Sequence, residues 1–249
     1  MQNKPSKSPQ PASPAESFAP LPRTARSAAG PTMVKQAYDY LLTALMTLQI
    51  PPGERIAIDQ VARRLNISQT PVREALSQLE AQKLVSKTPN VGYRASPQMT
   101  RKEVGDLYAL RQLIEPFAAA RAAEAMTPEM VAPLEEIAHD MATIVEGEAS
   151  SYSSFAEADD KLHRLIAAMS GNQLIADMTE RLHAHMHIFR ALSSTNAPSE
   201  AAGEHRALID ALIKGDPEAA ERAMLNHLER SHERMDRVLA ANGEAARSS

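Results

Sequence analysis

The sequence predicts a mainly α-helical chain, with an N-terminal winged helix-turn-helix that includes a small β-hairpin, followed by an antiparallel bundle of six helices. Three observations predict it. Apolar residues recur at helical spacing along most of the chain. Helix punctuation such as Ser170-Gly171-Asn172 and Gly215-Asp216-Pro217 separates the segments. Two short segments with strand character interrupt the helices near residue 90.

Composition restricts the compartment and the chemistry. The 249 residues contain no cysteine, which excludes disulfides, thiolate metal sites and a cysteine nucleophile. No run of about 18 apolar residues is present, and the first residues lack an apolar signal-peptide core. We therefore expect no membrane association and a cytoplasmic location.

Charge divides the chain into unlike parts. The net charge is −4, yet residues 33–97 carry 8 basic and 5 acidic side chains, whereas residues 98–249 carry 15 basic and 25 acidic ones. All eight histidines lie between His139 and His232. A basic front part suits contact with a polyanion, and an acidic part rich in histidine suits a cation or another subunit.

We expect four regions. Residues 1–31 form a Pro/Ser/Ala-rich tail with too little apolar surface to fold, and serve either to strengthen non-specific DNA binding or as a solubilising leader. Residues 32–97 form the winged helix-turn-helix. Residues 98–241 form the helical bundle, and residues 242–249 a flexible end.

The elements of residues 32–97 follow from local signals. Helical spacing predicts a first helix over 33–48, stopped by Pro51-Pro52-Gly53. A second is expected over 59–65 with Asp59 as its N-cap, and a third from Ser68, with Pro71 in its first turn. Segments 84–87 and 92–95 read as a hairpin. This order of elements is that of a winged helix-turn-helix, whose third helix enters the DNA major groove. Three short helices followed by a hairpin also occur in purely structural modules.

The motif residues carry a resemblance. The stretch PPGERIAIDQVARRLNISQTPVREALSQLEAQKLVSKTPNVGY resembles the DNA-binding domain of GntR-type bacterial transcription regulators, whose hallmark includes V-S-R-T-P-V-R-E-A-L. The family usually has Arg between the Ser and the Thr, where this chain has Gln69. Because Arg pairs with guanine and Gln with adenine, the DNA site is expected to differ at that base pair.

The candidate DNA contacts divide by role. We expect Gln69 and Arg73 to read bases, while Ser68, Thr70 and the wing contact phosphates. The wing residues are Asn90, Gly92 and Tyr93. The alternative for Gln69 is that it only solvates the start of a helix.

The second part reads as six helices with helical apolar spacing. Their expected ranges are 101–125, 128–147, 152–170, 173–194, 199–214 and 217–241. Antiparallel bundles build ligand and metal sites in their interiors from facing helices.

Four residues are candidate metal ligands. Asp159 and His163 are four residues apart and share one helix face, and His205 and His227 lie at the boundaries between apolar and polar faces of the last two helices. A carboxylate with three imidazoles suits Zn, Ni or Mn. The plainer alternative is a solvated Asp159–His163 pair.

This part is similar to the FCD ligand-binding domain of the FadR/VanR-like branch of the GntR family. Asp159 and His163 match its D-x-x-x-H, Ser170-Gly171-Asn172 its S-G-N turn, Glu204-His205 its E-H, and Met224 with His227 its M-x-x-H. The resemblance implies that the Asp and the three His bind a metal, and that a carboxylate effector bridges to it.

Two further features concern the pocket. Arg111 occupies the place of the family arginine that faces the cavity, where it could clamp an effector carboxylate. The alternative is an ion pair between Arg111 and Glu115 within the same helix. His183, His185 and His187 form a rival cluster for the metal. Their helix faces the bundle, so one of them could line the pocket, but surface histidines or an adventitious site are the plainer interpretation.

The resulting hypothesis is a ligand-responsive, metal-binding transcription regulator, and not an enzyme. It would bind a palindromic operator in double-stranded DNA as a homodimer, act as a repressor, and respond to a small carboxylate effector. Two alternatives remain: a metalloenzyme that uses the His/Asp site to activate water, and a purely structural metal with the effector bound elsewhere.

Overall fold

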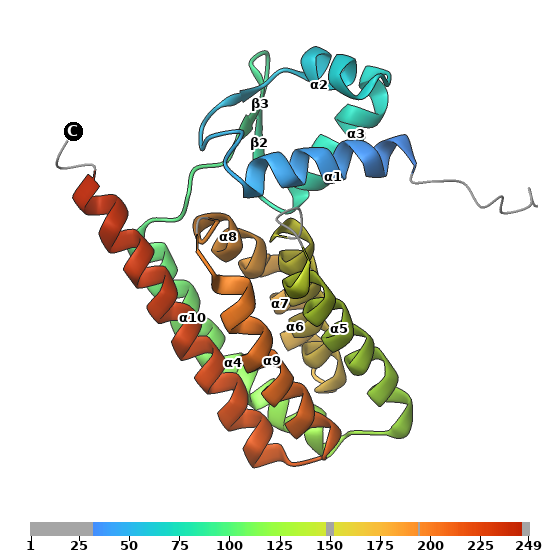
Figure 1. Ribbon diagram of the computed structural model, residues 1–249, viewed down its shortest axis with the longest axis vertical. Helices are drawn as coiled ribbons and strands as arrows, with labels where there is room; N and C mark the ends of the chain where they lie inside the picture. Colours follow the sequence, from blue (N-terminus) through green and yellow to red (C-terminus); the bar gives the residue numbers. More distant parts are fainter. Residues whose placement is uncertain (1–31, 148–151, 194, 246–249) are drawn as a thin grey trace, which may run out of the picture. The chain divides into compact units, whose positions relative to one another are not determined.

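The computed structural model describes residues 32–147, 152–193 and 195–245, with side chains described as far as residue 241. The tail expected over 1–31 lies outside these residues. The mainly α-helical class predicted from the sequence is confirmed (Figure 1). Among the described residues, no helix is both long and apolar enough to cross a membrane.

The N-terminal elements have the predicted order. Helices α1 (Met33–Met46), α2 (Ile58–Leu65) and α3 (Gln69–Ala81) are followed by the hairpin strands β2 (Val85–Thr88) and β3 (Gly92–Ala95). A short strand that the sequence did not reveal, β1 (Arg55–Ile56), pairs antiparallel with β3, which gives the sheet order β1-β3-β2. With two residues, β1 is too short for a period-two pattern to be visible.

Local chemistry explains most helix ends. The Oγ1 of Thr32 accepts a hydrogen bond from the backbone of Lys35 at the start of α1, and Asn66 closes α2 in the left-handed region. The expected N-cap of α2 was wrong: the cap is Ala57, and Asp59 lies inside the first turn. There Asp59 pairs with Arg63 and adds a favourable charge near the helix N-terminus.

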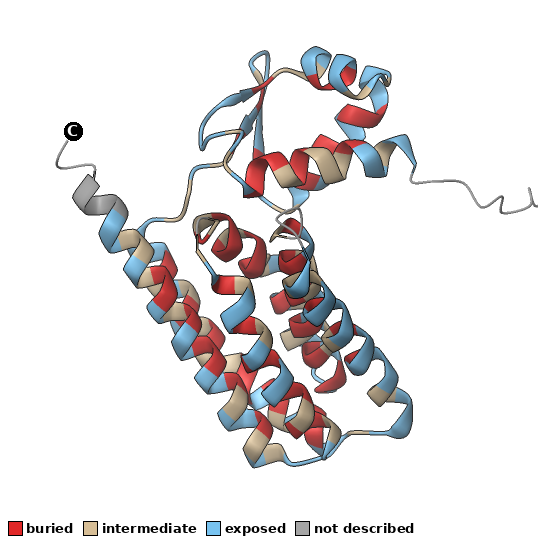
Figure 2. Ribbon diagram, viewed as in Figure 1, coloured by how far each residue is buried: buried red, intermediate tan, exposed pale blue. Residues whose placement is uncertain are grey.

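Helix α3 is held by its inner face. Val72, Ala75, Leu76 and Leu79 are completely buried, as their spacing predicts (Figure 2). Because this face is fixed in the core, the residues on the other face of α3 are exposed along its first turns.

The C-terminal elements form a helical bundle. Helices α4 (Arg101–Glu124) and α10 (Pro217–Ala245) lie side by side along their length, and α9 (Ala197–Ile213) packs beside α10 (Figure 1). Helices α5 (Pro128–Glu146) and α6 (Tyr152–Met169) pack against each other. A capping box between Thr100 and Glu103 starts α4.

One helix expected from the sequence is divided into two in the structure. The segment predicted as a single helix over 173–194 is divided into α7 (Gln173–Leu182) and α8 (Ala184–Ala191) by His183, whose φ is 45°. A left-handed residue ends the hydrogen-bond ladder of a helix, and nothing in the apolar spacing marks it. The break turns α8 so that it packs on α6. At the other end of the bundle, α10 extends to Ala245, past its expected end at 241.

The interior of the bundle contains a polar cluster. Its members are charged or imidazole side chains that are at most 8% exposed, in a core otherwise built from Leu, Ile, Ala, Met and Phe: Arg111, Glu115, Asp159, His163, His185, Glu204, His205, His227 and Arg234. Ionisable side chains are rarely buried unless they pair or bind an ion, so this cluster is the place to look for function.

Leu76→Ala tests the core beneath α3. The substitution removes a fully buried side chain, so we expect it to lower the free energy of unfolding by about 2–5 kcal/mol. Gln78→Ala is the matched control on the exposed face of the same helix, with an expected change within about 0.5 kcal/mol. Denaturant unfolding measures both, and equal effects would show that α3 is not anchored by this face.

Candidate functional site

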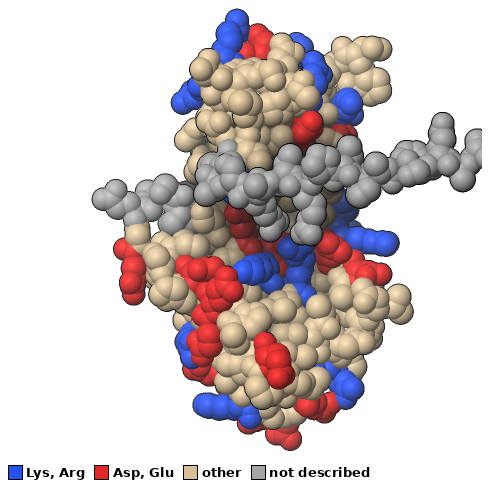
Figure 3. Space-filling view, turned by 90° about the vertical axis from the view of Figure 1, so that its right-hand side faces the viewer, with Lys and Arg blue, Asp and Glu red and all other residues tan. Residues whose placement is uncertain are grey.

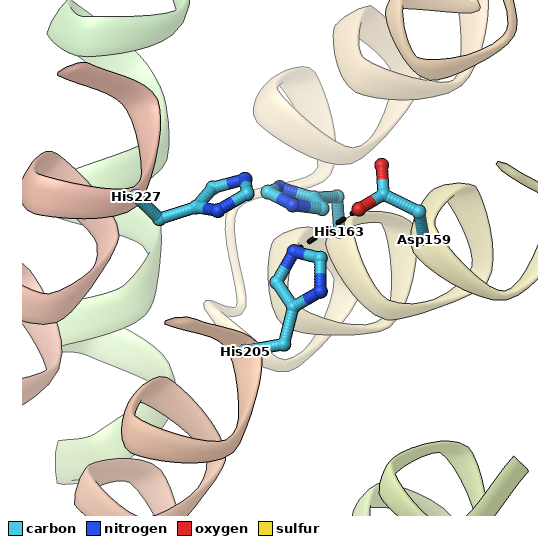
Figure 4. Close-up of side chains that lie close together, drawn as sticks. All are labelled: Asp159, His163, His205 and His227. Carbon is cyan, nitrogen blue, oxygen red and sulfur yellow. Dashed lines mark ion pairs between the residues drawn. The ribbon is translucent and has the colours of Figure 1, made fainter. Parts of the chain in front are cut away.

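Four side chains meet in the middle of the bundle. Asp159 and His163 come from α6, His205 from α9 and His227 from α10, and none is more than 3% exposed. One potential ligand atom from each lies within 4.8 Å of the others. Figure 4 shows the three imidazoles and the carboxylate converging from these helices. The structure thus brings together all four residues that the sequence singled out as a metal site.

Local geometry explains the convergence. Residues four apart on a helix lie on the same face, so the inner face of α6 that buries Phe155 and Ile166 also carries Asp159 and His163 inward. The Nε2 of His205 lies 3.0 Å from Oδ1 of Asp159. The solvated surface pair that was the alternative for Asp159 and His163 is therefore excluded.

Each of three cluster residues is held by a neighbour. Nδ1 of His163 donates to Oε2 of Glu115 at 2.7 Å, and Nδ1 of His227 donates to Oε2 of Glu204 at 2.9 Å. Asp159 accepts a short hydrogen bond at Oδ2 from Nδ1 of His185. When Nδ1 of a neutral histidine donates a hydrogen bond, Nε2 carries the free lone pair, which is the arrangement that a metal-binding histidine needs.

Two arginines hold the glutamates in turn. Nε and Nη2 of Arg111 donate to Glu115 at 2.6 and 3.3 Å, and Nη1 and Nη2 of Arg234 donate to Glu204 at 2.7 and 3.0 Å. Two parallel chains, Arg111–Glu115–His163 and Arg234–Glu204–His227, therefore run into the cluster. Paired contacts of this kind fix the geometry of the carboxylates as well as their charge.

These contacts set the ionisation of the cluster. Burial opposes the charge on Glu204, but hydrogen bonds from Arg234 and His227 outweigh it and lower the pKa of this carboxyl to about 2. Burial likewise opposes the charge on Asp159, yet His185 and His205 hold its pKa well below the usual value. Burial, reinforced by His205, lowers the pKa of His227 to about 3. At neutral pH the carboxylates are ionised and His227 is neutral, the forms that bind metals.

The residues present fit a divalent metal. In the described part of the chain, several buried polar atoms of the cluster have no hydrogen-bond partner: Oδ1 of Asp159, Nε2 of His163, and both ring nitrogens of His205. Such orphaned atoms are costly unless something occupies the space between them. Three imidazoles and one carboxylate are the ligands preferred by Zn, Ni and Mn.

A second group also meets the spacing of a metal site. Glu115, His163 and His185 have ligand atoms within 4.8 Å of one another. However, both oxygens of Glu115 already accept hydrogen bonds from Arg111, and Oε2 also accepts one from His163. The first group, with its unpartnered atoms, is the better candidate.

Arg111 fulfils parts of both predictions made for it. It pairs with Glu115, as the plainer alternative predicts, and the pair is buried. It also lines a small cavity of about 10 Å³ beside the cluster, together with Asp159, His185, His227 and Arg234. Arg111 can therefore influence both His163, through Glu115, and a molecule in the cavity.

Of the three histidines in the rival cluster, only one lies in the buried polar cluster. His185 lies inside the polar cluster at 2% exposure, whereas His183 ends α7, and neither His183 nor His187 belongs to a group with metal-site spacing among the described residues. The sequence predicted that one of the three could line the pocket but not which one, because the approach of His185 depends on the break at His183. Nor could it assign the buried carboxylates and Arg234 their roles, since they act through contacts between helices.

The predicted DNA-binding residues also gather on one surface. Ser68, Gln69, Thr70 and Arg73 are exposed at the start of α3, where Nη2 of Arg73 donates to Oε1 of Gln69 at 3.4 Å. A surface hollow is lined by residues from α3, from the wing and from β1: Arg55, Gln69, Arg73, Asn90, Gly92 and Tyr93 are among them. Arg55 was not predicted, because its position depends on the pairing of β1 with β3.

Tyr93 differs from the other wing residues. Its side chain is only 5% exposed, and the ammonium of Lys87 lies 5.5 Å from its ring centroid. The ring therefore supports the hairpin from inside, and its burial does not favour the predicted contact between Tyr93 and phosphate, which stays a prediction. Asn90 is exposed at the hairpin turn with a φ of 62°, and Gly92, with a φ of 100°, is partly exposed.

Charged side chains cover both parts of the chain. In the view of Figure 3, Lys and Arg side chains stand out over the helix-turn-helix and wing, whereas Lys and Arg are interspersed with Asp and Glu over the bundle. A basic surface around an exposed recognition helix is what contact with DNA phosphates requires.

Comparison with known proteins identifies two family models along the chain. A family model described as bacterial regulatory proteins, gntR family, matches residues 33–94, and one described as FCD domain matches residues 106–230. The HTH-type transcriptional repressor RspR of Escherichia coli (strain K12) is 29% identical over 212 residues, which cover 84% of this chain and 92% of that protein.

Two other matches extend the comparison. The probable D-xylose utilization operon transcriptional repressor of Paenarthrobacter nicotinovorans is 29% identical over 199 residues, 79% of this chain and 86% of that protein. Among solved structures, E. coli McbR/YncC aligns with a TM-score of 0.62 at 22% identity, covering 84% of this chain and 99% of that one. The structural likeness shows the fold alone.

His205→Ala tests the metal site. His205 belongs to the first group only, so we expect the variant to lose at least about 100-fold in affinity for zinc, because even the partners of metal ligands contribute about 10- to 100-fold. His163→Ala should have the same effect, and His187→Ala, on α8 but outside the cluster, should keep the metal. Elemental analysis after dialysis measures all three. Metal retained by His205→Ala and lost by His187→Ala would move the site to α8.

Gln69→Arg tests base reading. We expect the preferred base at one position of each half-site to change from adenine to guanine, with a discrimination of about 1–3 kcal/mol. Sequencing of selected DNA fragments measures the change. Gln78→Arg adds the same charge at an exposed position near the end of α3 and should leave the motif unchanged. An unchanged motif for Gln69→Arg as well would assign Gln69 to solvation of the helix start.

Proposed function

The chain belongs to the GntR family of bacterial DNA-binding transcription regulators and carries an FCD domain. On this basis we propose that it is a metal-binding regulator whose affinity for operator DNA is controlled by a small carboxylate. The observation that carries the proposal is the cavity in the bundle, which is lined at once by candidate metal ligands and by two buried arginines. This is a receptor for an anion, placed in a chain that also presents a DNA-reading surface.

The cavity favours an acid for electrostatic reasons. Arg111 and Arg234 both line it at 5% exposure or less, and burial makes their interaction with an anion stronger than it would be in water. A bound Zn, Ni or Mn ion would supply a Lewis acid that takes one carboxylate oxygen. Asp159, His163, His205 and His227 would hold that ion, and Arg111 would orient the acid.

Family membership decides between the functional classes. The family and the relatives are transcription regulators and not enzymes, so the metalloenzyme alternative is set aside. A purely structural metal remains the competing proposal for the cluster. The cavity beside the ligands favours the effector role, because a structural site has no need of an adjoining space lined with arginines.

We propose repression as the sense of regulation. The relatives RspR and the probable D-xylose operon regulator are both named repressors. A homodimer on a palindromic operator is part of the same proposal, since two-fold DNA symmetry mirrors two-fold protein symmetry. A coupling of about 1–3 kcal/mol between the acid and DNA would change operator affinity by about 5- to 150-fold. The cytoplasmic location of such a regulator stays a prediction.

Selection of genomic DNA fragments tests the proposal. The zinc-loaded protein is incubated with fragments at one salt concentration near physiological, where non-specific binding is weak. We expect a short palindrome to emerge, and to be lost with Arg73→Ala. Acids related to the neighbouring genes are then added, and one of them should release the operator from zinc-loaded protein only.

Two results would count against it. DNA binding that shows no sequence preference and weakens steeply with salt would contradict the proposal of a specific operator. If an acid released DNA equally well from protein stripped of its metal, the metal would have a structural role only.

A further inference from the structure

The outer face of the three-stranded sheet carries two arginines that add nothing to the apolar core. Successive residues of a strand point to opposite faces of a sheet. Ile56 of β1 and Tyr93 of β3 lie opposite each other, and each is only 5% exposed, so their side chains occupy the inner face. The neighbouring residues Arg55 and Arg94 therefore belong to the outer face, and both are exposed.

The two arginines lie directly opposite each other. Arg55 and Arg94 are cross-strand partners in the register of β1 and β3. Side chains placed in this way have their Cβ atoms about 4.5–5.5 Å apart, and like charges at such positions destabilise a sheet. Nη1 of Arg94 donates to the backbone oxygen of Gly53 at 2.9 Å, which orients this guanidinium without neutralising it.

Neither guanidinium forms an ion pair with a carboxylate among the described residues. Within the described part of the winged helix-turn-helix, the ion pairs join Lys35 to Asp39 and Arg63 to Asp59. An unfavourable pair of exposed charges is explained if an anion lies between them when the protein is at work. The planar guanidinium suits phosphate in particular, because it can donate two parallel hydrogen bonds to it.

Arg55 connects this face of the sheet to the surface that would read DNA. It lines the surface hollow that also includes Gln69, Arg73 and Asn90, which has a volume of about 330 Å³. It also lines a second hollow of about 360 Å³, together with Arg64. Arg55 thus lies at the border of the base-reading surface, which is where the phosphates next to the read bases would pass.

We propose that Arg55 and Arg94 together bind one phosphate of the operator backbone, beside the bases that α3 reads. The inference rests on the proposed function, because it adds an interaction surface to the same operator complex. It extends the DNA-binding surface from α3 and the hairpin turn to β1 and the outer face of the sheet. A phosphate contact fixes the position of the protein on the duplex and does not select a base.

Arg55→Gln and Arg94→Gln each remove one of the two charges. Fluorescence anisotropy measures the binding of full-length protein to the selected operator and to a duplex of scrambled sequence, over a series of salt concentrations. We expect each variant to lose about tenfold in affinity for both duplexes, because a charge-assisted hydrogen bond is lost. The slope of log affinity against log salt should become shallower by about 0.9 for each phosphate contact removed, and the preferred motif should not change.

The double variant Arg55→Gln/Arg94→Gln tests whether the two arginines share a phosphate. Residues that contact one group do not act independently, so the combined loss of affinity should be smaller than the product of the two single losses. A combined loss equal to that product would show two separate contacts and would overturn the shared site.

Reversal of the charge separates DNA binding from a structural role. In Arg55→Glu the carboxylate lies opposite Arg94, so a like-charge pair becomes an ion pair, and the midpoint of denaturant unfolding should rise. Operator affinity should fall by about 100-fold, further than in Arg55→Gln, because a carboxylate repels the phosphate. A structural role for Arg55 predicts the opposite pattern, with a lower unfolding midpoint and unchanged DNA binding by the folded protein.

Lys35→Gln is the matched control. It removes one positive charge from an exposed side chain near the start of α1 that lines neither hollow. Because charges away from the contact are screened by salt, affinity and salt slope should stay within about twofold of the wild-type values.

Three results contradict the inference, and they are distinguishable. Unchanged affinity and salt slope in both single variants would remove the phosphate site and leave the operator. Equal losses in Lys35→Gln and Arg55→Gln would assign the effect to net charge. Absence of sequence-specific binding by the wild-type protein would remove the operator complex itself, and with it the proposed function. If one arginine variant fails to fold, the other decides.

Discussion

The burial of an ionised carboxylate, Asp159, in the middle of a helical bundle is the constraint on which the rest of this half depends. A charge at 2% exposure must be compensated, and here Oδ2 of Asp159 accepts a hydrogen bond from His185, while Oδ1, which has no hydrogen-bond partner, lies 3.0 Å from Nε2 of His205. Those two histidines come from α8 and α9, so compensating the buried charge of Asp159 on α6 requires both helices to pack close to it. The same convergence leaves unpartnered nitrogen and oxygen atoms at the centre, which is why the cluster suits a cation.

The cluster is organised in layers that reach the outer helices. Arg111 on α4 holds Glu115, which holds His163, and Arg234 on α10 holds Glu204, which holds His227. Because α4 and α10 lie side by side, an anion that competes for either guanidinium acts on the longest helix pair of the bundle. Buried pairs of this kind are weak sources of net stability but fix geometry, and breaking one leaves an uncompensated charge. A cavity built this way suits the proposed role as a receptor for an acid.

The DNA-binding surface is built on the opposite principle. Its scaffold is an apolar core beneath α3, and the residues that would meet DNA stay exposed and available. The wing combines both roles: Tyr93 anchors the hairpin from inside, which leaves Asn90 exposed at the turn. Reading DNA needs accessible donors and acceptors on a rigid support, whereas sensing an acid needs a small, dry, charged interior.

The sequence by itself determined most of the elements and the four residues, Asp159, His163, His205 and His227, that meet inside the bundle. Apolar spacing gave α1 to α6, α9 and α10 to within a few residues, and the i, i+4 spacing of Asp159 and His163 placed them on one face, because these signals are local. Only the tertiary structure decided the break at His183, the strand at Arg55, the burial of Tyr93, and the roles of His185, Glu115, Glu204 and Arg234. Each of these depends on which residues of other elements lie opposite. A single left-handed residue rotates a helix and brings a histidine into the site, and no periodicity along the chain records that contact.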